Sequence, residues 1–231
     1  MSPLFDLKGI RFGYPGRPAV LDGVDFRLDA GERLCLTGFN GAGKSTLLHI
    51  MVGLLKPDAG EVVAFGAPRR AEADFHEVRR RAGLVFQDPD DQLFCPTVAE
   101  DVAFGPLNLG KSRAEAAEIV DRVLENLNLS AFRNRITHKL SGGEKRLVTL
   151  AAVLAMEPDV LLLDEPTNAL DERTTERLVE ILCGLPQAMV IVSHDPHFRA
   201  KVVTRSIRLE HGRLEAPDGG PDHDCCRVAA Q

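Results

Sequence analysis

Uninterrupted apolar runs mark several segments of the chain as buried strands. Residues 160–163 read Val-Leu-Leu-Leu and residues 189–192 read Met-Val-Ile-Val, both without a polar residue. Runs of this kind are typical of parallel strands that helices cover on both faces. Residues 84–87 and the apolar-rich segment 32–37 predict two more strands. The pattern therefore predicts an α/β core.

Residues 4–30 show a different pattern, in which apolar and polar residues alternate. Turn residues stand at 13–16 (Gly-Tyr-Pro-Gly) and at 22–23 (Asp-Gly). Alternation with such breaks predicts antiparallel strands. Near the other end, residues 206–209 and 213–214 flank His-Gly, which predicts a closing hairpin.

Helical spacing is clearest in two segments. One begins at Lys44 and stops near Gly53, and the other covers residues 112–127. Because no buried-strand run lies around the second helix, we expect a helical subdomain over about residues 88–157, after which the α/β core resumes. Residues 216–231 are rich in Pro, Gly and Asp, and we expect them to be disordered.

Composition limits the class of protein and its partners. The chain has 231 residues, of which 44% are hydrophobic and 27% charged, enough for one large domain. A net charge of −6 without a basic stripe does not indicate a nucleic-acid partner. No apolar run approaches the roughly 20 residues that span a bilayer, so any membrane link is expected to go through a partner protein. Five cysteines, mostly in apolar segments, favour a reducing cytosol.

Residues 38–45 read Gly-Phe-Asn-Gly-Ala-Gly-Lys-Ser and stand between a predicted strand and a predicted helix. This is the context that the phosphate-loop motif G-x-x-x-x-G-K-[ST] requires. Its glycines let the backbone approach an anion, and the loop N–H groups and helix N-terminus attract phosphate. Lys44 would reach the β- and γ-phosphates, Ser45 would bind Mg²⁺, and Thr46 would support the α-phosphate. A glycine-rich turn without function would not need the full spacing and both flanks.

Polar side chains follow the buried strands directly. Asp164 and Glu165 end one apolar run, and His194 closely follows another. The carboxyl ends of parallel strands form the ligand-binding edge of an open α/β sheet, so we expect these side chains near the phosphate loop. Asp164 suits Mg²⁺, and Glu165 is the candidate that polarises an attacking water. His194 could contact a γ-phosphate, and Gln87 could sense Mg²⁺ or the water. Alone, each would more simply be a solvated or structural side chain.

Residues 140–144, Leu-Ser-Gly-Gly-Glu, open another predicted helix. Ser141 would cap it, and the free N–H groups behind Ser141 would form a second anion site. This loop has nothing obvious to bind in its own subunit. One chain that carries both halves of a phosphate clamp suggests two copies facing each other, with ATP buried between them. The alternative is a simple helix cap.

The order of these motifs along the chain resembles that of ATP-binding cassette ATPases, and the resemblance covers about residues 4–214. The motifs are, in order, the phosphate loop, Gln87, residues 140–144, Asp164 with Glu165, Ala-Leu-Asp at 169–171, and His194. The resemblance implies an α/β fold in residues 1–215: a RecA-like phosphate-loop core, an N-terminal antiparallel β subdomain and a helical subdomain that carries the 140–144 loop, called the signature loop below. It implies a dimeric ATPase that uses ATP and Mg²⁺, with residues 169–171 crossing the dimer interface. It also implies that Tyr14 stacks on adenine beside Ala19 and Val20, although a surface tyrosine is the simpler alternative.

The resemblance carries a set of site residues. The residues expected to bind nucleotide are Tyr14, Ala19, Gly38, Asn40, Gly41, Ala42, Gly43, Lys44, Ser45, Thr46, Gln87, Ser141, Gly142, Gly143 and Glu144. Those expected at the metal are Ser45, Gln87 and Asp164. Those expected to act in hydrolysis are Glu165, His194, Gln87 and Lys44.

The chain departs from the family pattern at two positions. Glu144 stands where many members have glutamine, and Ala169 stands where glycine is common. Glu144 adds a negative charge near phosphate. We expect it to weaken closure around the nucleotide without abolishing it.

Residues 88–94 and 97–106 resemble the ATPases of energy-coupling-factor importers, most closely their cobalt and nickel branch. This implies a peripheral subunit at the cytoplasmic face of the membrane that energises metal import, cobalt before nickel, with a second identical ATPase and integral membrane subunits as partners. Phe94, Pro96 and Phe104 could form an apolar groove for a helix of such a partner. They could equally fill the core of the helical subdomain.

Other functions stay open or are disfavoured. A chromosome or DNA-repair ATPase would need a long coiled coil, and no sustained heptads occur. A translation-type protein would need two cassettes in one chain, and no repeat is visible. The resemblance after Gln87 is the only feature that argues against the ATPase of another importer or of an exporter. His223, Cys225 and Cys226 are soft metal ligands, although three such residues on a tail are more often incidental.

Overall fold

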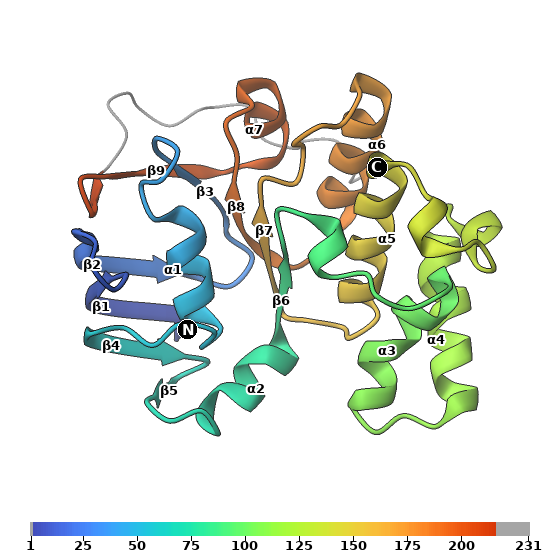
Figure 1. The fold of residues 1–231 in the computed structure, drawn as a ribbon, viewed down its shortest axis with the longest axis horizontal. Helices are drawn as coiled ribbons and strands as arrows, with labels where there is room; N and C mark the ends of the chain where they lie inside the picture. Colours follow the sequence, from blue (N-terminus) through green and yellow to red (C-terminus); the bar gives the residue numbers. More distant parts are fainter. Residues whose placement is uncertain (1, 216–231) are drawn as a thin grey trace.

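The structure is a computed structural model that describes residues 2–215 (Figure 1). Its strands are β1 (Phe5–Gly13), β2 (Ala19–Leu28), β3 (Arg33–Thr37), β4 (Ala59–Ala64), β5 (Ala67–Arg69), β6 (Ala82–Val85), β7 (Val160–Asp164), β8 (Ala188–Val192), β9 (Arg205–Glu210) and β10 (Arg213–Glu215). Its α-helices are α1 (Lys44–Met51), α2 (Asp74–Arg81), α3 (Val98–Asn108), α4 (Arg113–Asn126), α5 (Gly142–Leu154), α6 (Glu172–Gly184) and α7 (Pro196–Val202). Short 3₁₀ helices are η1 (Pro89–Asp91), η2 (Ser130–Phe132) and η3 (Thr137–Lys139).

The alternating N-terminal segment forms the predicted antiparallel strands, in a sheet of order β2-β1-β4-β5. The turn predicted at residues 22–23 is wrong, because both residues lie inside β2. Arg11 pairs with Asp22 and Ile10 pairs with Val24, so Gly23 is an extra residue between two ladder pairs. Gly23 takes a φ of +77°, which lets β2 form a bulge there without steric cost.

The buried runs form a second sheet, of order β10-β9-β3-β8-β7-β6 within residues 2–215. Strands β9, β3, β8, β7 and β6 are parallel to one another, and β10 pairs antiparallel with β9 at the edge in the predicted hairpin. The strand predicted at 84–87 ends earlier, at Val85. The side chain of Gln92 accepts a hydrogen bond from the Phe86 N–H and donates one to the Leu84 carbonyl. The Gln92 side chain therefore takes the place of a neighbouring strand at the end of β6. Gln87 lies in the loop that follows.

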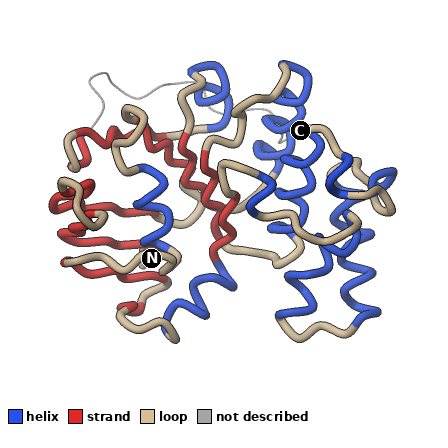
Figure 2. Tube along the Cα trace, viewed as in Figure 1, coloured by secondary structure: helices blue, strands red, loops and turns tan. Residues whose placement is uncertain are grey.

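Each face of the second sheet supports its own hydrophobic core. Val160 and Leu162 join a core with α1 and the antiparallel sheet, whereas Leu161 and Leu163 join a core with α3 to α7. Helix α1 therefore lies between the two sheets, α2 adds Phe75 and Val78 to the same core, and α3 to α7 cover the opposite face (Figures 1 and 2). Burial on both faces explains why the β7 run contains no polar residue before Asp164.

The helix predicted at 112–127 is α4, and it begins with a capping box in which Ser112 and Glu115 satisfy each other's backbone N–H groups. The predicted helical subdomain, residues 88–157, contains η1, α3, α4, η2, η3 and α5. None of the helices in the described part of the chain is long and apolar enough to cross a membrane. His223, Cys225 and Cys226 lie outside the described residues.

A buried carboxylate ties the start of α3 to the segment that leads into α5. Asp101 is 5% exposed, and its Oδ1 accepts hydrogen bonds from the N–H groups of Phe94 and Cys95 at 3.0 and 2.9 Å. Its Oδ2 accepts the hydroxyl of Thr137 at 2.8 Å. A single side chain thus holds residues on both sides of α4 together.

Candidate active site

The phosphate loop connects β3 to α1 as predicted, and its glycines are required by geometry. Gly38 has a φ of +141°, and a Cβ there would come within 2.2 Å of the Leu209 carbonyl oxygen. Gly43 precedes α1 with a φ of +104°, and a Cβ there would meet Val20 at 2.6 Å. Glycine is therefore required at both positions, by the backbone conformation and by the close approach of Leu209 and Val20.

Lys44 folds back over the loop. Its Nζ donates to the carbonyl oxygens of Gly38 at 2.9 Å and Phe39 at 3.0 Å, and it lies 3.2 Å from Nε2 of His194. Lys44 is only 7% exposed. Burial lowers the pKa of Lys44, and the nearby carboxylates of Glu165 and Asp164 partly offset this effect.

Glu165 lies beside the same histidine. Its Oε1 is 3.2 Å from Nε2 of His194, so this one nitrogen adjoins both the ammonium group and the carboxylate. Burial raises the pKa of Glu165, opposed by the charges of His194 and Lys44. The Glu165 backbone has a φ of +45°, a left-handed conformation that is rare outside glycine. A hydrogen bond from its N–H to the Val192 carbonyl, at 2.9 Å, helps to hold it there.

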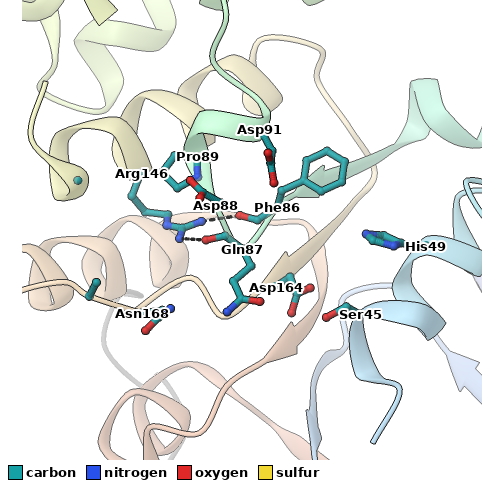
Figure 3. A pocket seen from close by; sticks show the side chains of 12 residues that line it. Ser45, His49, Phe86, Gln87, Asp88, Pro89, Asp91, Arg146, Asp164 and Asn168 are labelled. Carbon is teal, nitrogen blue, oxygen red and sulfur yellow. Dashed lines mark hydrogen bonds between the residues drawn. The ribbon is translucent and has the colours of Figure 1, made fainter. Parts of the chain in front are cut away.

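Asp164 offers an oxygen that has no partner in the described chain. Asp164 is 4% exposed, and its Oδ1 is buried without a hydrogen bond to any described residue. Ser45 and Gln87 line the same cavity, of about 510 Å³, and Figure 3 shows the three side chains directed into it. A carboxylate, a hydroxyl and an amide oxygen form a donor set that a hard divalent cation accepts. The residues present therefore fit Mg²⁺.

Arg146 is a site residue that the sequence analysis missed. It is 3% exposed, and its guanidinium donates to the carbonyl oxygens of Phe86 at 2.6 Å and Gln87 at 2.5 Å (Figure 3). It belongs to α5, two residues beyond Glu144. Arg146 thus fixes the Gln87 loop against the helix that the signature loop opens. The sequence gives little sign of this role, because Arg146 directly follows Glu144 and Lys145 at the polar start of α5.

Tyr14 lies over the start of α1. Its hydroxyl is 3.1 Å from the Thr46 hydroxyl, and its ring packs edge-on against Phe12 with centroids 5.0 Å apart. Tyr14 lines a second cavity, of about 450 Å³, with the phosphate loop, Glu165 and Val20. Ala19 is exposed and is not among the residues that line this cavity.

The signature loop caps its helix as predicted. The Ser141 hydroxyl accepts the N–H of Glu144 at 3.3 Å, and the Glu144 carboxylate accepts the N–H of Ser141 at 2.8 Å. Gly142 lies at the rim of the Ser45–Asp164 cavity. Ser141, Gly143 and Glu144 instead line a different cavity, of about 1320 Å³, to which the phosphate loop does not contribute. A single chain therefore does not bring these three residues to its own phosphate loop.

The negative charge of Glu144 is paired. Its carboxylate receives both terminal nitrogens of Arg135, at 2.6 and 3.3 Å. The side-chain hydrogen bond from Arg135 lowers the pKa of Glu144. At the other departure from the family pattern, Ala169 has a φ of +59°, in the region that favours glycine.

Comparisons with known proteins agree with this geometry. Residues 21–168 match the family model described as ABC transporter. A Brucella suis protein described as an ABC transporter ATP-binding protein, without a named cargo, is 55% identical over 93% of this chain and 89% of its own. The cobalt import ATP-binding protein CbiO of Rhodobacter capsulatus is 46% identical over 94% of this chain and 79% of its own.

Two solved structures share the fold. CbiO1 from Clostridium perfringens, part of the ABC transporter complex CbiONQ, superposes with a TM-score of 0.83 at 31% identity, covering 93% of this chain and 88% of its own. The ATP-binding cassette MJ0796, in a dimeric post-hydrolysis state bound to ADP and Pi, has a TM-score of 0.82 at 29% identity, covering 94% of this chain and 100% of its own. The match over most of the chain, with a phosphate loop in the expected place, shows that this protein belongs to the ABC transporter ATPase family.

Proposed function

We propose that this chain is the ATP-hydrolysing subunit of an energy-coupling-factor importer for a transition-metal ion, cobalt as first candidate and nickel as second, and that two copies work as a pair. The observation that carries the pairing is the separation of the two anion-binding loops. Ser141 and Gly143 line a cavity that the phosphate loop does not share, and only Gly142 of the signature loop reaches the cavity that Ser45 lines. A facing copy would bring both loops onto one triphosphate. The dimeric MJ0796 cassette bound to ADP and Pi supports this arrangement.

The nucleotide-binding domain would comprise residues 1–215, with the helical subdomain at 88–157. Tyr14 would stack on adenine, and Thr46 would support the α-phosphate. Lys44 now bonds two loop carbonyls, and its ammonium would turn to the β- and γ-phosphates. The remaining nucleotide contacts would come from Ala19, Gly38, Asn40, Gly41, Ala42, Gly43, Ser45 and Gln87, and from the facing copy's signature loop.

Ser45, Gln87 and Asp164 are the residues that would hold Mg²⁺. The buried and unpartnered Oδ1 of Asp164 is the observation that supports this assignment. When bound, Mg²⁺ would neutralise charge that develops on the β- and γ-phosphate oxygens. Arg146 would keep Gln87 in reach of this position by holding the backbone of the Gln87 loop.

Glu165 and His194 would carry out the hydrolytic step. The Glu165 carboxylate would accept a proton from water as the water oxygen attacks the γ-phosphorus in line. The bond from the γ-phosphorus to the β–γ bridging oxygen then breaks, so that ADP and phosphate leave. The raised pKa of Glu165 makes it a better proton acceptor than an ordinary carboxylate. His194 would donate a hydrogen bond to the transferring group.

The surface around Phe94 would receive a helix of the membrane subunit. Phe94 and Phe104 are 64% and 43% exposed, and their rings meet edge to face at 4.7 Å. Phe94 also lines a cavity of about 480 Å³ with Pro96 and Ile136. Exposed aromatic side chains beside a cavity are typical of a helix-binding groove, whereas side chains that filled the subdomain core would be buried. Such docking would place the chain at the cytoplasmic face of the membrane as a peripheral subunit.

The cargo rests on the relatives. The R. capsulatus relative is named for cobalt import, whereas the B. suis relative carries no cargo in its name. The test is metal accumulation in cells that express the chain with its membrane subunits, compared with the same cells carrying Glu165→Gln. We expect cobalt uptake that the variant abolishes. Uptake of neither cobalt nor nickel by the parent complex would reject the metal assignment.

The pairing is tested separately, by ATP turnover per subunit as a function of protein concentration. Turnover should rise with concentration, because the composite site forms only in the dimer. A preparation that stays monomeric with ATP bound and still hydrolyses at full rate on dilution would contradict the paired site.

A further inference from the structure

We propose that Arg135 is a positioning residue that cancels the charge of Glu144, so that the signature loop can accept the triphosphate held by a second copy. This inference rests on the proposed paired site. It assigns a function to the substitution of glutamate for the more common glutamine at position 144.

The first support is the geometry of the pair. Arg135 approaches Glu144 with two nitrogens, Nη1 at 2.6 Å from Oε1 and Nη2 at 3.3 Å from Oε2. Oε2 also accepts the N–H of Ser141 at 2.8 Å. The carboxylate is therefore directed back along the chain toward Arg135, and it carries a counter-charge at its side.

The second support is that Arg135 is held in place without a partner subunit. Its N–H donates to the Phe132 carbonyl at 2.8 Å, and its carbonyl accepts the N–H of Val98 at 3.1 Å. Its guanidinium lies over the Phe132 ring, 4.6 Å from the centroid. Backbone and side chain are both fixed, so the counter-charge is present before any nucleotide arrives.

The third support is electrostatic. Anions are favoured at a helix N-terminus, but a glutamate in the first turn already uses that preference. Without Arg135, a second anion brought to Ser141 would meet an uncompensated carboxylate. With Arg135, the signature loop presents no net charge from these two side chains. Sequence alone therefore predicts weaker closure than the structure does.

The test measures ATP-driven dimerisation by analytical ultracentrifugation, in a Glu165→Gln background that slows hydrolysis. Arg135→Met should weaken dimerisation about tenfold at low salt, which corresponds to about 1.4 kcal/mol. Because the cause is charge, the ratio of parent to variant should approach one near 1 M salt, where the Debye length is about 3 Å. Arg135→Lys, which keeps the charge, should lose much less.

The matched control is Arg133→Met. Arg133 lies two residues away and pairs with the exposed Asp121 at 2.6 Å, so its loss should leave dimerisation unchanged. Adding Glu144→Gln to Arg135→Met should return dimerisation to the parent level. ATP affinity of the monomer should stay unchanged in all these variants. Tyr14 fluorescence reports it, because the chain has one tyrosine and no tryptophan.

A purely structural role for Arg135 would give a different result. The methionine and lysine variants would then be equally impaired, at low and at high salt, which would overturn the inference. So would an Arg135→Met protein that dimerises like the Arg133 control. If Arg135→Met does not fold, the Glu144→Gln variant alone tests the inference. It leaves the Arg135 guanidinium without its carboxylate, so dimerisation should tighten at low salt. Failure of the Glu165→Gln parent to dimerise with ATP would reject the paired site itself.

Discussion

The ammonium nitrogen of Lys44 and Nε2 of His194 lie 3.2 Å apart, although one begins α1 and the other follows β8. The Oε1 atom of Glu165 lies 3.2 Å from the same Nε2. Three residues from three separate segments therefore form one contact network before nucleotide binds. If Lys44 turns toward phosphate as proposed, His194 and Glu165 would lose a cationic neighbour and would become available to the reacting groups.

Glu165→Gln should bind ATP but hydrolyse it at least about 10² times more slowly, because the amide cannot accept the proton of the attacking water. The variant should also accumulate as an ATP-bound dimer. Phosphate release and ultracentrifugation measure the two effects. Glu118→Gln, at an exposed position on α4, is the control and should behave like the parent. Turnover near the parental rate in Glu165→Gln would exclude Glu165 as the base.

Tyr14→Ala should weaken ATP binding by about tenfold to a hundredfold, since stacking on a base contributes about 1–3 kcal/mol. Tyr14→Phe keeps the ring and loses only the contact with the Thr46 hydroxyl, so its affinity should stay within a few-fold of the parent. Calorimetric titration with a non-hydrolysed ATP analogue measures both. Equal affinities in the two variants would show that the ring does not contact adenine.

Ala169→Gly should raise the free energy of unfolding slightly, by up to about 1 kcal/mol. Relief of the left-handed conformation at φ +59° contributes about 1–2 kcal/mol, and the added freedom of glycine in the unfolded chain removes part of that gain. Urea denaturation measures the difference. Ala117→Gly, inside α4 and without a positive φ, should instead lose about 1 kcal/mol. A loss of similar size at both positions would argue against strain at Ala169.

Glu144→Gln should lower stability at neutral pH by about 1 kcal/mol or less, since the pair with Arg135 is partly exposed. Arg135 lowers the pKa of Glu144 in the folded state. The stabilisation is therefore complete above the ordinary carboxyl pKa of 4.5 and is lost as the pH falls through the lowered value. Urea denaturation of both proteins from pH 7 to pH 3 should show the difference disappear at the acid end. A constant difference would mean that the carboxylate charge is not involved.

Arg146→Met should reduce ATP turnover more than ATP affinity, because it releases the Gln87 loop and leaves the phosphate loop intact. It should also lower stability by about 2–3 kcal/mol, as two carbonyl groups lose a charged donor. Arg122→Met is the control, since Arg122 pairs only with the exposed Glu157 among described residues. A variant that loses affinity and turnover in proportion would place Arg146 in nucleotide binding instead.

Much of the fold was accessible from sequence because burial leaves a direct trace. The run at 160–163 has no polar residue since both faces of β7 are covered, and Gly38 and Gly43 of the phosphate loop stand where a Cβ would clash. The bulge at Gly23 was misread as a turn, because glycine after aspartate signals both. Local spacing does not distinguish a reversal of the chain from one extra residue in a strand.

The parts of the site that sequence could not supply are contacts between distant segments. Arg146 reaches the Gln87 carbonyl across 59 positions, and Glu144 depends on an arginine nine positions before it. Neither pairing leaves a periodic pattern. From the sequence, only the negative charge of Glu144 can be considered. Arg135, which compensates this charge, is brought beside Glu144 by the fold of the segment before α5.

In the proposed transport cycle, Asp101 would have a mechanical consequence. Its two carboxylate oxygens bind the backbone beside Phe94 and the hydroxyl of Thr137, four residues before Ser141. A displacement of the surface around Phe94 would move the Thr137 segment with it, unless the buried carboxylate of Asp101 lost one of these hydrogen bonds. The surface around Phe94 and the segment that leads to the signature loop would then move as one rigid unit. Movement of a bound membrane subunit would thereby be transmitted to the interface between the two copies.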